Sequence, residues 1–131
     1  MKKCSWCTVD NGLLVLRVGV GLIFIYSGYM KAATMGMTVG YFGAMGFAPF
    51  WAYLVTAVEI LGGLAVLLGA WTRTAATLLT IVMIVAVYKV YTMPGVDAMT
   101  RQLMIMTPIA VFFSTLALTL AGGGSKSVVK E

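Results

Sequence analysis

Residues 50–71 read FWAYLVTAVEILGGLAVLLGAW, and this stretch decides the class of the protein. A membrane-spanning helix needs about 20 mostly apolar residues, which this run supplies. Glu59 is its only charged residue. A carboxyl group is costly to bury in a bilayer and usually is paired or functional. We therefore predict a transmembrane helix here, with Glu59 as the candidate catalytic residue.

Three further runs qualify as spans. The first contains Arg17, the next has Lys89 near its end, and the last has no charge but holds Pro108, where a kink is expected. Strand-like alternation of the outer-membrane barrel type is absent, which favours helices. The sequence thus predicts an all-α, integral membrane four-helix bundle, whose other spans are Leu13–Met30, Thr74–Tyr91 and Leu103–Ala121.

Composition supports one membrane domain. The 131 residues are 61% hydrophobic and 10% charged, with a net charge of +5, whereas a soluble domain carries about 25% charged residues. The basic residues stand mostly at segment ends, so the lipid bilayer is the expected partner and nucleic acid is not. Histidine is absent, which argues against a haem site, and no metal site is expected.

We expect three regions: an N-terminal tail over residues 1–12, the transmembrane domain over 13–121, and a flexible C-terminal tail over 122–131. The connection 32–49 is rich in glycine and is either a loop, an interfacial helix or a re-entrant segment. Residues 72–74 are expected to form a tight polar turn, and 92–100 a loop around Pro94-Gly95.

Four spans place both termini on one side of the membrane. The basic residues on that side are Lys2, Lys3, Arg73, Lys126 and Lys130, with Arg17 close to it. The other side has Lys31, Lys89 and Arg101. This bias favours cytoplasmic termini.

Residues of the first span recur every three or four positions, which places them on one helix face: Arg17, Gly21, Phe24, Gly28 and Lys31. The second span has a similar face with Glu59, Gly62 or Gly63, Val66, and Gly69 or Ala70. Glycines let helices approach closely in lipid, so we expect the two faces to pack together. The candidate ligand-binding residues are Arg17, Gly21, Gly28, Lys31, Glu59, Gly62, Gly63 and Lys89.

The depth of Glu59 bears on its partner. It lies about 14 Å into its helix from Phe50, and roughly 10 Å in height from Arg17, Lys31 or Lys89. A direct ion pair is therefore expected to be strained, and a neutral carboxyl group, a bridging water or a ligand head group is the expected alternative. Arg17 and Lys31 can also extend to the two interfaces, and Glu59 can join helices as a neutral acid.

Cys4 and Cys7 form a C-x-x-C pattern in the N-terminal tail. Such a pair exchanges electrons with a quinone in some membrane redox proteins, and it also suits half a zinc site. No second ligand pair exists in the sequence, so a complete zinc site is not expected. Cytoplasmic termini would place the pair on the reducing side, where stable disulfides are rare. This pattern is a weak redox signal.

These residues also resemble a known family. The stretch LRVGVGLIFIYSGYMK at residues 16–31 is similar to the first span of DoxX-family membrane proteins, and residues 43–76 resemble the second block of that family. The stretch LAGGGSKS at 120–127 resembles its Gly-rich terminus. The chain departs from the pattern at Arg101, where an acid is often found, and in its C-x-x-C.

The resemblance implies a bundle of the prokaryotic cytoplasmic membrane with links to respiratory or redox assemblies, including quinone-reducing ones. Three functions remain open, and so does the question of whether the chain is an enzyme. It is a redox-linked subunit with a quinone near Glu59, or a scaffold or assembly subunit, or a small proton-coupled transporter or lipid-binding protein. Other membrane subunits or further copies of the chain are the expected protein partners.

Overall fold

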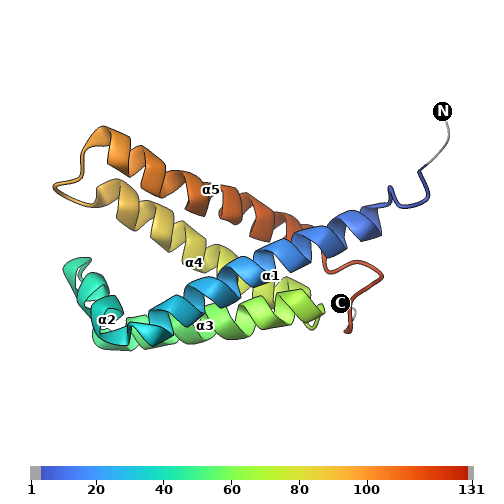
Figure 1. Ribbon diagram of the computed structural model, residues 1–131, viewed down its shortest axis with the longest axis horizontal. Coiled ribbons are helices and arrows are strands. Elements are labelled where there is room, and N and C mark those ends of the chain that lie inside the picture. The colour runs from blue at the N-terminus through green and yellow to red at the C-terminus, as the bar shows by residue number, and fades with distance from the viewer. Residues whose placement is uncertain (1–3, 130–131) are drawn as a thin grey trace.

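The computed structural model describes residues 4–129, and all its regular elements in that range are helices. They are α1 (Val9–Ala33), α2 (Met35–Ala44), α3 (Pro49–Leu68), α4 (Thr72–Thr92) and α5 (Ala98–Ala121). All but α2 are long and apolar enough to cross a membrane. The prediction of an all-α, four-helix membrane bundle is confirmed, with α2 as a fifth, short helix (Figure 1).

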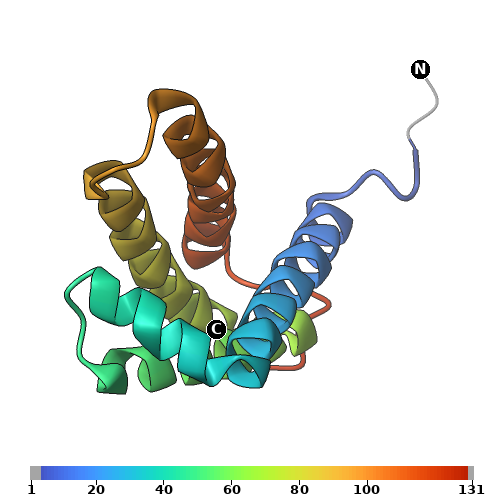
Figure 2. The same cartoon turned by 60° about the vertical axis from the view of Figure 1, so that its left-hand side comes forward.

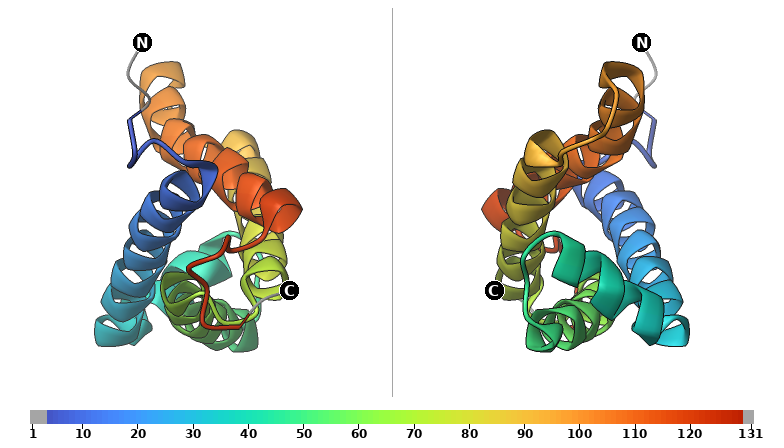
Figure 3. Two further views of the ribbon diagram at one scale, coloured as in Figure 1. Left: turned by 90° about the vertical axis from the view of Figure 1, so that its right-hand side faces the viewer. Right: turned by 90° about the vertical axis from the view of Figure 1, so that its left-hand side faces the viewer.

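The long helices form two pairs. α1 packs along α3, and α4 along α5, while contacts between α3 and α4 join the pairs and α1 and α5 touch sparsely. Seen from the ends, the pairs enclose the centre of the bundle (Figure 3). The buried apolar core lies where they meet and consists of Val20, Phe24, Val66, Ala75, Ala76, Leu79, Val111 and Leu118.

Capping residues fix the helix ends. The Thr8 side chain accepts a hydrogen bond from the Asn11 backbone amide, so α1 begins one turn earlier than the predicted span. α3 ends at Gly69, whose φ of 77° is the left-handed conformation that glycine tolerates. The predicted turn at 72–74 is wrong by a few residues, because this glycine turns the chain first and α4 already begins at Thr72.

The glycine-rich connection 32–49 contains a helix, so it is not a plain loop, and both an interfacial helix and a re-entrant segment fit this finding. α2 packs mainly against α3 at the end of the bundle away from the described termini (Figure 2). The α4–α5 loop lies at the same end. There the Asp97 carboxylate accepts a hydrogen bond of 3.0 Å from the Thr100 amide, and hydrogen bonds from Thr100 lower the pKa of Asp97.

The segment expected to be a flexible tail is anchored where the structure describes it. The amides of Val128 and Val129 donate to the carbonyls of Leu68 and Gly69 at 3.4 and 3.1 Å. The Ser125 amide donates to Asp10 at 3.0 Å. Lys2, Lys3 and Lys130, which entered the topology prediction, lie outside the described residues.

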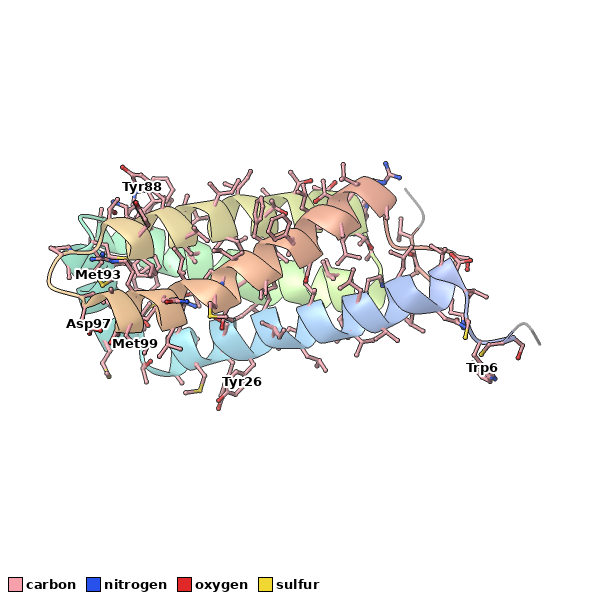
Figure 4. All side chains as sticks on the ribbon, turned by 90° about the horizontal axis from the view of Figure 1, so that it is seen from above. Trp6, Tyr26, Tyr88, Met93, Asp97 and Met99 are labelled. Atoms are coloured by element: carbon pink, nitrogen blue, oxygen red, sulfur yellow. The ribbon has the colours of Figure 1, made fainter. Side chains whose placement is uncertain are left out.

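The outer surface of the bundle is apolar. Large hydrophobic side chains are exposed on every long helix, as lipid contact requires. Tyr26 of α1 and Tyr88 of α4 point outward on opposite sides (Figure 4). Pro108 lies inside α5, which continues through it as one helix.

Candidate functional site

Close contact between α1 and α3 sets the frame of the candidate site. A Cβ atom added at Gly21 would lie 2.8 Å from the Gly63 carbonyl oxygen, and one added at Gly28 would lie 2.5 Å from the Ile60 side chain. The predicted packing of these two glycine faces is therefore confirmed. Gly62 differs, because it faces Leu79 of α4 instead of α1.

The contact brings three polar side chains together between α1 and α3. Lys31 Nζ lies 2.9 Å from Glu59 Oε2 and 2.7 Å from Ser27 Oγ, and the Ser27 hydroxyl donates to the same Glu59 oxygen at 3.2 Å. The Glu59 side chain is only 3% exposed, and that of Lys31 is 27% exposed. This is an ion pair supported by a hydroxyl group, on the inner side of the helix pair.

The expectation that a direct ion pair between Glu59 and a lysine would be strained is wrong. It assumed that α1 ends at the height where α3 begins. Gly28 instead lies beside Thr56 and Ile60 of α3, because α2 carries the chain further along the bundle axis before α3 begins. Lys31 is then only about 4.5 Å further along the axis than Gly28, a distance that its long side chain spans.

Ser27 did not figure in the sequence prediction. It is the only Ser or Thr between residues 9 and 31, and it lies one helical turn before Lys31. A lone hydroxyl at that spacing from a charged residue is the signal that could have identified it.

The polar group forms part of the wall of a cavity of about 600 Å³ in the half of the bundle that holds α2. Apolar side chains from all five helices make up most of its lining, among them Phe24, Phe42, Trp51, Val82 and Val111. Several lining residues are themselves exposed, so the cavity opens at the surface of the bundle. Cavities of this size and apolar character, with a few polar groups, are typical ligand sites.

Lys89, which belongs to the predicted ligand-binding set, also lines this cavity. Its Nζ donates to the Met45 carbonyl at 3.1 Å and lies 4.6 Å from the centre of the Phe47 ring. Lys89 therefore connects α4 to the segment between α2 and α3.

Arg17 is not part of this site. It is buried and donates to the carbonyls of Val66 and Leu67 at the end of α3, at 3.2 and 3.4 Å, and to that of Gly123 at 2.9 Å. Its partners lie about two helical turns from Glu59 along α3. The predicted grouping of Arg17 with Glu59 is thus wrong, because backbone carbonyls at the helix end satisfy the guanidinium group.

Cys4 and Cys7 lie far from the cavity. Both are exposed and form no disulfide, and they precede α1 at the end of the bundle away from α2. The Cys7 thiol donates to Cys4, which lowers the pKa of Cys4 and raises that of Cys7. Over residues 4–129, no group of three or more His, Cys, Asp or Glu side chains is placed to hold a metal ion.

Four apolar helices around a cavity with a buried ion pair define a small multi-pass membrane protein. The sequence model of the DoxX family matches residues 12–92, and the chain belongs to that family.

Two relatives extend the comparison. Inner membrane protein YqjF of Escherichia coli is 34% identical over 134 aligned positions, which cover 98% of this chain and 94% of that protein. The Bacillus subtilis protein named "Putative oxidoreductase CatD" is 38% identical over 81 residues, which cover 62% of this chain and 60% of CatD. The chain thus matches less than two thirds of the length of CatD. No solved structure matches the chain.

Proposed function

We propose that the protein is a membrane subunit of a redox-linked complex and that its cavity binds a quinone. The observation that carries the proposal is the Lys31–Glu59–Ser27 group on the wall of a mostly apolar cavity. A quinone has an apolar body and ring oxygens that accept hydrogen bonds. The apolar lining of the cavity suits the body, and the Lys31 ammonium group suits a ring oxygen. The name "Putative oxidoreductase" that CatD carries supports a redox role.

The polar group has the capacity to receive a ring oxygen. An ammonium group has three N–H donors. Lys31 uses two of them, on Ser27 and Glu59, which leaves one for a ligand. The Glu59 carboxylate holds Lys31 in place and compensates its charge, as a charged group inside a membrane requires.

Reduction of a bound quinone takes two electrons and two protons. We propose that a partner subunit supplies the electrons. Both protons come from water at the opening of the cavity. One is taken up by Glu59 and passes through the hydrogen-bonded group of Glu59, Ser27 and Lys31, which joins α1 to α3, to the ring oxygen that Lys31 contacts. The other proton reaches the second ring oxygen directly from that water. Glu59 is then the proton-carrying residue and Lys31 the orienting one.

Trp51 provides a direct test, because it lines the cavity while Trp6 and Trp71 do not. We expect 2-methyl-1,4-naphthoquinone to quench Trp51 fluorescence saturably in a Trp6→Phe/Trp71→Phe background in nanodiscs. Lys31→Met should weaken binding at least about tenfold, because a hydrogen bond to a charged donor contributes roughly 1.5–3 kcal/mol.

Ser114→Ala is the matched control, since the Ser114 hydroxyl bonds only to the Ala110 carbonyl of its own helix. It should leave binding unchanged. Absence of saturable quenching in the parent protein would overturn the quinone proposal and favour a scaffold role, in which the ion pair only joins α1 to α3.

A further inference from the structure

The charges on the cavity wall do not balance. Its charged lining residues are Lys31, Glu59 and Lys89. Lys31 and Glu59 neutralise each other as an ion pair. Within residues 4–129 that is the one ion pair in which a cavity lysine takes part, so Lys89 has no carboxylate partner there. The cavity therefore holds one uncompensated positive charge.

The partners of Lys89 leave this charge available. The Met45 carbonyl and the Phe47 ring are both uncharged, and they occupy one N–H donor and one side of the ammonium group. Further N–H donors remain for a ligand.

We propose that the cavity selects an amphipathic anion, with its apolar body among the lining side chains and its negative oxygen at Lys89. An uncompensated charge in apolar surroundings is costly, and an anionic ligand removes that cost on binding. This inference rests on the proposed quinone site and narrows its ligand to a quinone with an ionised ring hydroxyl.

A pair of matched ligands tests the charge preference. 2-Hydroxy-1,4-naphthoquinone is an anion at pH 7.5, whereas 2-methyl-1,4-naphthoquinone is neutral. We expect the anion to bind at least about tenfold more tightly, equivalent to about 1.4 kcal/mol. Quenching of Trp51 in phosphatidylcholine nanodiscs provides the measurement.

Substitution of Lys89 assigns the preference to its charge. Lys89→Gln removes the charge but keeps a polar N–H group, so it should lower the affinity for the anion about tenfold more than the affinity for the neutral quinone and thereby abolish the preference. Lys89→Arg should retain the preference. Equal losses for both ligands in Lys89→Gln would mean that Lys89 only positions the α2–α3 segment, and would overturn the inference.

Two further outcomes separate the proposals. If neither ligand binds the parent protein, the proposal of a quinone site is wrong. If both ligands bind with equal affinity, the quinone site is retained and the proposed preference for an anion is wrong. Phosphatidylglycerol added to the nanodiscs distinguishes the source of the anion. Competition by this lipid in the parent but not in Lys89→Gln would show that the anion is a lipid head group and would overturn the ionised quinone as the ligand.

Discussion

At the scale of single residues, Lys31 and Glu59 are unequal partners. Glu59 is almost fully buried, whereas Lys31 is partly exposed and lies in the last turn of α1. A lysine there can extend its ammonium group to the interface if its partner is lost. The shorter side chain of Glu59, in the middle of α3, cannot reach the interface in this way. Loss of the lysine should therefore cost more than loss of the acid.

We expect Lys31→Met to destabilise the protein by about 2 kcal/mol or more, since it leaves a buried acid without its partner. Glu59→Gln should cost less than about 1 kcal/mol, because Lys31 regains solvent. The double variant should be more stable than Lys31→Met alone. Reversible unfolding in mixed detergent micelles measures all three, and equal losses in the two single variants would contradict the asymmetry.

Sequence predicts the members of this pair but not their contact. The cost of a charge in lipid identifies Glu59, and helical spacing places Lys31 on the face that meets α3. Their relative height depends on how far α2 carries the chain along the bundle axis before α3 begins. The spacing of residues within one helix does not predict this offset between α1 and α3. The spacing of Ser27 from Lys31 indicates a contact between these two residues, but the hydrogen bond from Ser27 to Glu59 depends on the same relative height.

At the scale of helices, α1 carries glycines of two kinds. Gly21 faces the α3 backbone, where an added Cβ would lie 2.8 Å from the Gly63 carbonyl oxygen. Gly19 has nothing within 4 Å of such an atom. The same helix thus contains a packing glycine and a matched open one, two residues apart.

Gly21→Ala should destabilise the bundle by about 1–3 kcal/mol, because a crowded backbone has to move apart. Gly19→Ala should be neutral or stabilising by up to about 1 kcal/mol, since alanine is the better helix former. Thermal unfolding of the two purified variants compares them directly. Similar melting temperatures would show that α1 and α3 do not need this close approach.

At the scale of the whole molecule, the described chain begins and ends at one end of the bundle, and the cavity lies in the other half. Hydropathy predicts the number of spans and hence this arrangement. It does not predict the cavity, which depends on how far the two helix pairs separate. The pairing of α1 with α3 follows from facing glycines, but no comparable pattern marks α4 and α5.

Cytoplasmic termini remain a prediction from the distribution of basic residues. Cys4 and Cys7, both exposed, are the only cysteines. We expect a membrane-impermeant maleimide to label them in inside-out vesicles but not in intact cells. Labelling in intact cells would reverse the topology.

The pKa of Cys4 is lowered and that of Cys7 is raised, so the two thiols should differ in their rate of labelling, which mass spectrometry can measure. Thiolate is the reactive form, so a group with a lowered pKa reacts at lower pH. With limiting maleimide near neutral pH, Cys4 should react before Cys7, and the difference should disappear as pH rises above both pKa values.

The contacts of Arg17 have a consequence for the order of events during synthesis. Arg17 leaves the ribosome 106 residues before Gly123, whose carbonyl it binds, and 49 residues before Val66. While the first helix is inserted alone, its arginine must therefore find water or lipid head groups. It acquires its native carbonyl partners only as later segments arrive. We therefore expect final closure of this end of the bundle to be a late step, after insertion of the helices, that requires the C-terminal segment.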